Sequence, residues 1–195
     1  MLFDGHTYRT LIVSSSDKTT EFLRRLLPGG TFQPLDTVSG AGDARRLLLN
    51  TGYDLVLING PLADETGIEL AGDAVDRSGA GVLLLVRGEH YDAIASRVTP
   101  QGVFALAKPT NGQAVFQAVC LLCAMRERLR VMEQRNRSLR ERMEEIRLVN
   151  RAKWALISYL NLSEADAHRF LEKQAMDMRI SKREAAENIL RTYEK

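Results

Sequence analysis

The chain has 195 residues, of which 45% are hydrophobic and 27% charged, so its composition is that of an ordinary globular protein with room for one or two domains. No apolar run approaches the roughly 20 residues that span a bilayer, and the first residues lack the layout of a signal peptide. We therefore expect a cytoplasmic protein without a membrane segment.

Charge is distributed unevenly. Residues 1–123 carry 10 Lys and Arg against 13 Asp and Glu, whereas residues 124–195 carry 17 against 12. The basic second half favours a nucleic-acid partner, although long solvated helices rich in Arg and Glu explain the same numbers equally well. Cys120 and Cys123 are the only cysteines, and they lie in a helical pattern without a second pair. This predicts reduced core residues rather than a metal or redox site.

In the first half, apolar runs of strand length alternate with segments of helical period. The predicted strands are 10–13, 31–35, 55–58, 82–86 and 103–106, and the predicted helices are 17–27, 41–50, 65–77 and 90–98. Five such units predict an α/β fold of the flavodoxin type, with a five-stranded parallel sheet in the order 2-1-3-4-5. Pro34 cannot donate to a strand ladder, so the run at 31–35 suits an edge strand.

Two segments of this half resemble response-regulator receiver domains. Residues 53–59 (Tyr-Asp-Leu-Val-Leu-Ile-Asn), with Pro61 and 67–70 (Gly-Ile-Glu-Leu), resemble the third strand and its following loop, and residues 104–109 (Phe-Ala-Leu-Ala-Lys-Pro) resemble the fifth strand. The resemblance implies a phosphorylation site in which Asn59 stands for the acceptor aspartate and Ser14 and Ser15 for the metal-binding acidic pair. It implies further that Val86 occupies the position of the family's hydroxyl residue at the end of the fourth strand. Lys108 would be the family's lysine, the one site residue that is retained.

These replacements predict a receiver that is not phosphorylated. An amide cannot act as a carboxylate nucleophile, and two serines lack the anionic oxygens that Mg²⁺ prefers. We therefore expect a pseudo-receiver that serves as a docking or dimerisation scaffold. We expect no catalytic residue, metal or cofactor, and no enzyme activity.

From about residue 112 to Asn161 the sequence has a seven-residue apolar repeat without a helix breaker. Four to five heptads of this kind predict a coiled coil that forms a homodimer, and the buried Asn136 would fix a parallel, two-stranded register. The alternative is a long amphipathic helix folded back on its own receiver. The predicted dimer seam consists of Leu122, Met125, Leu129, Met132, Asn136, Leu139, Met143 and Ile146.

Two helix start signals follow. Ser163 has the place of an N-cap before an acidic first turn, and the residues from Ser181 to Glu184 have the capping-box form Ser-x-x-Glu. With the end of the long helix, the two helices that they begin predict a three-helix module.

This module resembles the ANTAR domain of bacterial antiterminators. The resemblance rests on Arg147, on 150–153 (Asn-Arg-Ala-Lys), on 162–167 (Leu-Ser-Glu-Ala-Asp-Ala), and on apolar positions up to Leu190. It implies binding to paired hairpins in a nascent leader transcript, so that an overlapping terminator cannot form. The RNA-contact candidates are Arg147, Arg151, Ala152, Lys153, Arg179, Lys182 and Arg183.

Trp154 departs from the family, which usually has glycine at this position. The indole either packs in a core or an interface, or stacks on an unpaired loop base.

The predicted organisation is a pseudo-receiver over 1–111, a coiled-coil helix over 112–150 and an ANTAR domain over 147–195. We interpret the chain as an RNA-binding antitermination regulator, controlled by a regulatory partner protein or by dimerisation rather than by aspartyl phosphorylation. The alternative is a non-phosphorylated adaptor of a two-component-type signalling system.

Overall fold

The structure is a computed structural model, and it describes residues 5–193, which form two compact units that divide between Arg130 and Val131. The first unit has a parallel sheet in the order β2-β1-β3-β4-β5, as the sequence predicts. Its strands are β1 (Thr10–Ser14), β2 (Leu35–Val38), β3 (Leu55–Asn59), β4 (Gly81–Arg87) and β5 (Val103–Lys108).

The second strand is the one element that the sequence misplaced, since it was predicted over 31–35 and forms over Leu35–Val38. The backbone of Thr31 turns back on Pro28, with its N–H 3.0 Å from the Pro28 carbonyl oxygen. Phe32 is buried, but in a loop rather than a strand. Pro34 lies directly before β2, which is an edge strand as predicted.

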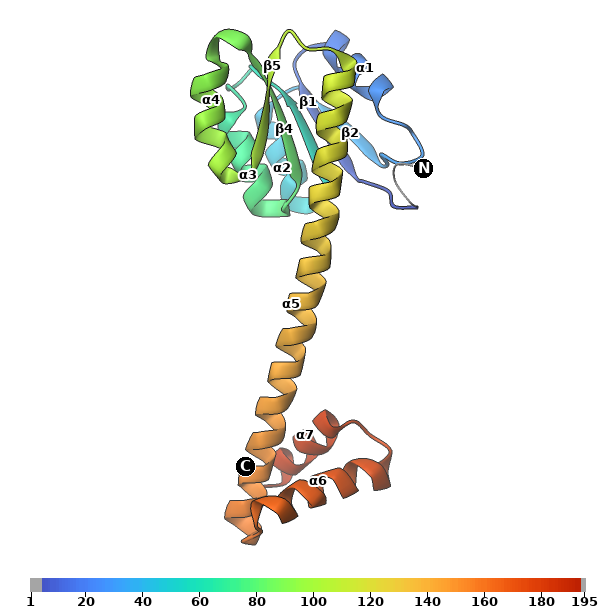
Figure 1. Cartoon of the computed structure of the whole chain (residues 1–195), viewed down its shortest axis with the longest axis vertical. Coiled ribbons are helices and arrows are strands. Elements are labelled where there is room, and N and C mark those ends of the chain that lie inside the picture. Colours follow the sequence, from blue (N-terminus) through green and yellow to red (C-terminus); the bar gives the residue numbers. More distant parts are fainter. Residues whose placement is uncertain (1–4, 194–195) are drawn as a thin grey trace. The chain divides into compact units, whose positions relative to one another are not determined.

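Helices cover both faces of the sheet (Figure 1). One face packs against α2 (Ala41–Asn50), α3 (Ile68–Ser78) and α4 (Tyr91–Val98), and the other against α1 (Asp17–Leu26) and the start of α5 (Gly112–Leu160). Short 3₁₀ turns at Gly88–His90 and Thr99–Gln101 flank α4. Strands β1 and β3 are buried along their whole length because both faces are covered.

The first turns of α5 belong to the core of this unit. Val115, Val119 and Leu122 pack beneath the sheet, and Leu122 is only 3% exposed. Leu122 therefore offers no surface to a second chain, and its assignment to the dimer seam is wrong. Cys120 and Cys123 are free thiols, and burial raises the pKa of Cys123 to about 12. That thiol stays protonated at neutral pH.

An ionic contact fastens α5 at the end of the sheet where β3 begins. Asp54 Oδ1 accepts a hydrogen bond from Arg130 Nη2 at 2.8 Å and lies 3.7 Å from Arg126 Nε. Its other oxygen accepts from the Arg9 backbone N–H at 3.0 Å. Sequence patterns gave Asp54 no role, and the structure identifies it as an anchor of the helix.

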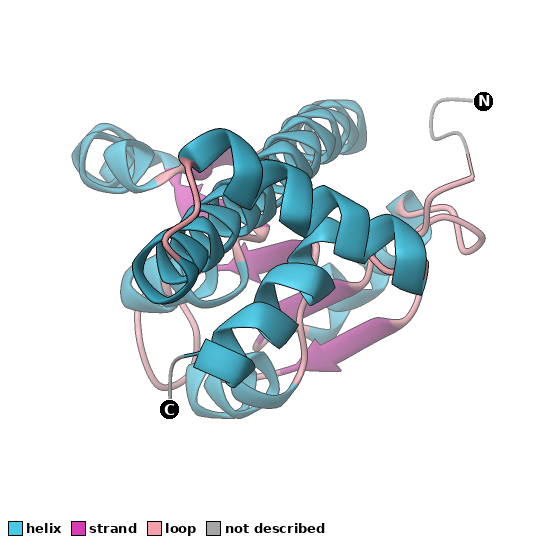
Figure 2. Cartoon of the chain, turned by 90° about the horizontal axis from the view of Figure 1, so that it is seen from below, coloured by secondary structure: helices cyan, strands magenta, loops and turns pink. Residues whose placement is uncertain are grey.

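The second unit combines the end of α5 with α6 (Glu164–Met178) and α7 (Lys182–Tyr193), as seen from below in Figure 2. Leu156, Leu171 and Ile189 form the centre of its core. Both predicted helix starts are confirmed. Ser163 Oγ accepts from the Asp166 N–H at 3.1 Å. The capping box closes with Ser181 N–H on Glu184 Oε2 at 2.8 Å and Glu184 N–H on Ser181 Oγ at 3.2 Å.

In the part of the chain that the structure describes, no helix combines the length and the apolar character that crossing a membrane requires.

Candidate functional site

At the carboxyl edge of the sheet, three of the predicted site residues form one hydrogen-bond network. Lys108 Nζ donates to Asn59 Oδ1 at 2.8 Å and to the Gly60 carbonyl oxygen at 2.6 Å. Asn59 Nδ2 in turn donates to Ser14 Oγ at 3.1 Å. Ser14 and Asn59 are buried, whereas Ser15 is exposed. Burial lowers the pKa of Lys108, and the positive charge of Arg87 adds to this effect.

This network satisfies its own polar groups without a carboxylate. The Asn59 amide is neutral, so it offers no anionic oxygen to a phosphoryl donor or a cation, and its oxygen and nitrogen are bonded to the lysine and the serine. Among residues 5–193 there is no group of three or more His, Cys, Asp or Glu side chains that could hold a metal ion. The arrangement acts as a packed polar contact between β1, β3 and β5.

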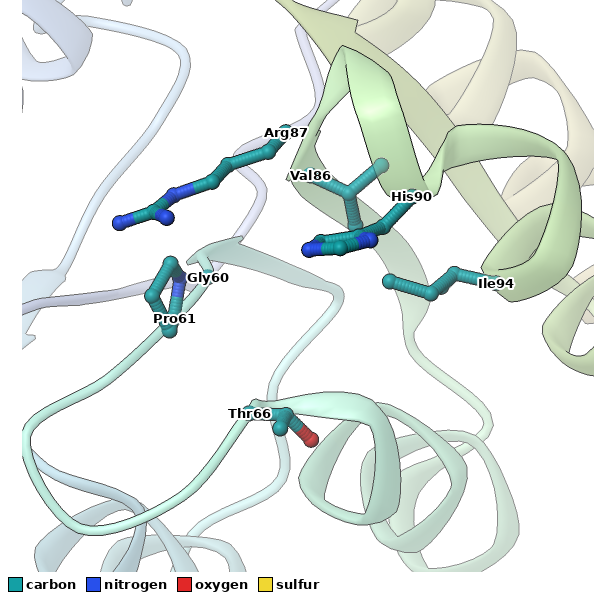
Figure 3. A pocket seen from close by; sticks show the side chains of 7 residues that line it. All are labelled: Gly60, Pro61, Thr66, Val86, Arg87, His90 and Ile94. Carbon is teal, nitrogen blue, oxygen red and sulfur yellow. The ribbon is translucent and has the colours of Figure 1, made fainter.

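A small pocket of about 210 Å³ lies beside the network (Figure 3). Val86, which the resemblance to receiver domains puts at the hydroxyl position, lines it together with Arg87 and His90. Glu89 lies 3.8 Å from Arg87 Nη1 and 3.4 Å from His90 Nε2, so a carboxylate partly offsets the positive charge beside this pocket. The full lining is Gly60, Pro61, Thr66, Val86, Arg87, His90 and Ile94.

Most of the predicted dimer seam is exposed along α5. Six of its apolar side chains have between 47% and 58% of their surface exposed, and Asn136 is also exposed. The alternative of a helix that packs on its own receiver describes the start of α5, whose apolar contacts extend to Cys123 and whose ionic contacts with Asp54 extend to Arg130. The seam itself stays a prediction. The six side chains are Met125, Leu129, Met132, Leu139, Met143 and Ile146.

Three of the predicted RNA-contact residues lie together in the second unit. Arg147 and Arg151 on α5 and Arg183 on α7 line one hollow of about 310 Å³, with Glu144 and Leu148. We call this the arginine hollow. All three arginines are exposed. Guanidinium groups from two helices that face one cavity suit an anionic ligand with several oxygens.

The remaining candidates lie elsewhere. Lys153 is mostly covered and pairs with Glu164, with 3.3 Å between Lys153 Nζ and Glu164 Oε1. Lys182 Nζ lies 2.6 Å from Glu172 Oε1, and this contact lowers the pKa of the glutamate. Arg179 ends α6 in the left-handed conformation, with φ of 53°.

Ala152 is fully buried in the core of the unit, so its assignment as an RNA contact is wrong. Its small side chain lets α5 approach the other two helices closely.

Trp154 is 67% exposed, so packing inside the core of its own unit is excluded. It lines a second hollow of about 300 Å³ with Asn150, Lys153, Ile157 and Glu164. Asn150 was not among the predicted RNA contacts. The spacing of 147, 150, 151 and 154 on a helix could have grouped these residues on one face.

Comparison with known proteins finds different relatives for the two units of the chain. Residues 137–190 match the ANTAR domain family. The transcriptional regulatory protein PdtaR of Mycobacterium tuberculosis (strain H37Rv) is 28% identical over 140 residues, which are 71% of this chain and 68% of that protein.

Solved structures resemble the first unit. The signal receiver domain of an HD domain-containing protein from Pseudomonas fluorescens Pf-5 has 21% identity and a TM-score of 0.57, over 64% of this chain and 93% of that one. A CheY-like receiver domain protein from Methanospirillum hungatei JF-1 has 19% identity and a TM-score of 0.54, over 63% and 98%. At this identity the likeness shows the fold alone. The chain therefore contains a segment, residues 137–190, that matches the ANTAR domain family, and this segment follows a unit with the receiver fold.

Proposed function

We propose that this protein binds RNA through its C-terminal unit and regulates transcription by antitermination. The observation that carries the proposal is the arginine hollow, where Arg147, Arg151 and Arg183 converge from two helices within the segment that matches the ANTAR family. Arginine pairs with phosphate through two parallel hydrogen bonds, and phosphate contacts supply much of the affinity for nucleic acids. The relative named a transcriptional regulatory protein supports a regulatory output.

The target that fits this architecture is a pair of short hairpins in a leader transcript. Protein bound to both hairpins would keep an overlapping terminator from forming. A dimer joined along the exposed seam from Met125 to Ile146 would carry two binding units, and tethering raises the effective concentration for the second contact. In this proposal the receiver-fold unit extends to Arg130, the seam overlaps its last turn, and the RNA-binding unit begins near Arg147.

Control in this proposal does not pass through an aspartyl phosphate. The position of the acceptor holds Asn59, whose amide oxygen is already bound to Lys108 Nζ at 2.8 Å. Regulation then depends on dimerisation or on a partner protein that docks on the receiver-fold unit. Incubation with acetyl phosphate and Mg²⁺ tests this point, and the mass of the protein should stay unchanged. A stoichiometric phosphoryl adduct within the first 130 residues would refute it.

RNA binding is tested by fluorescence anisotropy with labelled paired hairpins at several salt concentrations. Each of Arg147→Ala, Arg151→Ala and Arg183→Ala should weaken binding and reduce the slope of log K against log salt by about one for each phosphate that is no longer neutralised. Arg169→Ala is the matched control, because Arg169 is an exposed α6 arginine paired with Asp166 and lies outside the arginine hollow. Its slope should equal that of the wild type.

The proposal fails if the wild-type protein does not prefer paired hairpins to an uninterrupted duplex, or if the three variants bind as tightly as the control. A dimeric protein that binds no RNA would favour the adaptor. In a transcription reaction with a terminator that overlaps the hairpins, the wild type should increase read-through and Arg151→Ala should increase it less.

A further inference from the structure

Trp154 is an exposed indole on the face of α5 that points away from the core. Ala152, Ala155 and Leu156 are buried on the opposite face. With 67% of its surface exposed, Trp154 packs against little of its own unit. A large aromatic side chain in this position needs a partner from outside the unit to remove it from water.

The neighbours of Trp154 indicate the chemistry of that partner. Arg147, Arg151 and Trp154 are spaced i, i+4 and i+7, so they lie along one stripe of α5, with the indole about 10 Å beyond Arg147 along the axis. The stripe therefore leads from the arginine hollow to an aromatic plane. Such a combination of cations with an adjacent aromatic ring is typical of surfaces that bind unpaired nucleotides.

The hollow beside the indole adds hydrogen-bonding groups. Asn150 and Lys153 line it from α5, and Glu164 lines it from the first turn of α6. An amide, an ammonium and a carboxylate offer both donors and acceptors around the aromatic plane. These are the groups that read the edge of a base once its face is stacked.

We propose that Trp154 stacks on one unpaired base of a hairpin loop, with Asn150 at the edge of that base, while the arginine hollow holds phosphates of the adjoining stem. This inference deepens the proposed function and rests on it. It assigns loop recognition to a side chain that departs from the family pattern, and phosphate binding to the arginines.

A second copy of the chain fits this surface less well than RNA does. The apolar positions of the seam end at Ile146, and the next two heptad positions hold Asn150 and Lys153. A parallel coiled coil that continued to Trp154 would place polar and charged side chains in its interior, which costs stability.

The experiment uses the fact that Trp154 is the only tryptophan of the chain. The full-length protein is titrated with paired RNA hairpins whose loops are randomised in sequence, and with the same stems joined as an uninterrupted duplex. Anisotropy of a label on the RNA reports binding, and tryptophan emission reports the environment of this one side chain. We expect emission to be quenched by the hairpins in step with binding and to be unchanged by the duplex.

Two substitutions test the contribution to affinity. Trp154→Ala should lower hairpin affinity roughly 5- to 150-fold, the range expected for the loss of one stacked base, whereas Trp154→Phe should recover most of it. Met176→Ala is the control, since Met176 is an even more exposed apolar side chain on α6 outside both hollows. Its hairpin affinity should equal that of the wild type. Circular dichroism checks that each variant is folded.

The inference is overturned if hairpins bind while the tryptophan emission stays constant, or if Trp154→Ala binds hairpins as tightly as Met176→Ala. It is also overturned if Trp154→Ala dissociates the dimer in sedimentation, because the partner of the indole is then a second chain. If no hairpin binds at all, the proposed function fails and this inference fails with it.

Discussion

Replacing Asp54 by asparagine should release α5 from the end of the sheet. The carboxylate is 16% exposed and bonds Arg130 at 2.8 Å, with Arg126 3.7 Å away. Two unit charges about 4 Å apart attract by about 4 kcal/mol at an effective dielectric constant of about 20. Asparagine keeps an acceptor for the Arg9 N–H but removes the charge. Because solvent reaches Arg130, we expect a loss of about 2–3 kcal/mol in unfolding free energy.

Hydrogen exchange of peptides that cover β1 and β3, measured in the full chain at increasing urea, gives the unfolding free energy of the first unit by itself. Peptides from α6 serve as an internal reference and should not change. Asp43→Asn is the matched control, since Asp43 pairs with Arg46 on an exposed face of α2 and should cost about 0.5 kcal/mol at most. The reasoning is refuted if Asp54→Asn destabilises the first unit no more than this control does.

Four further outcomes are expected. Ser163→Ala removes the N-cap of α6 and should cost about 1 kcal/mol in the urea unfolding of the second unit, followed by hydrogen exchange of peptides from α6. Asn136→Leu should strengthen self-association and admit species larger than a dimer in sedimentation, if the seam forms. Backbone N–H groups at the start of α2 lower the pKa of Asp64, so its contribution to stability should be lost as pH falls below about 4. The difference in unfolding free energy between the wild type and Asp64→Asn should therefore shrink over that range. Cys123 should react with a thiol reagent at pH 8 only after unfolding, because burial raises its pKa to about 12.

The parallel sheet was predictable because each central strand is a nearly continuous apolar run between helix-period segments. The second strand was not. Phe32 is as buried as a strand residue, but its segment turns at Pro28. A run of apolar residues predicts burial, but it does not distinguish a buried strand from a buried loop.

The long helix shows a second limit. Leu122 fits both the heptad repeat of a coiled coil and the apolar face of a helix that packs on a sheet. The two patterns have periods of 3.5 and 3.6 residues, which cannot be distinguished over a few turns. Only the packing of Leu122 under β3 and β4 decides between them.

Sequence resemblance also identified only some of the features of the RNA-contact candidates. Family resemblance marked Ala152 together with the cations, but a small apolar residue in a helical module is matched for its packing, and Ala152 is buried. Arg147, Arg151 and Arg183 are exposed, whereas Lys153 is mostly covered, and their contact with RNA stays a prediction. Their grouping was not predictable, because Arg183 meets Arg147 and Arg151 only after α7 packs against α5.

The hydrogen bond between Lys108 and Asn59 bears on how long a response lasts. An acyl phosphate hydrolyses, and its lifetime gives an ordinary receiver a built-in timer that returns it to rest. Under the proposed control, Asn59 accepts a hydrogen bond from Lys108 and carries no phosphoryl group whose hydrolysis could end the response. The duration of any signal would then follow from how quickly the protein leaves its RNA or its partner, and from how much of it the cell makes.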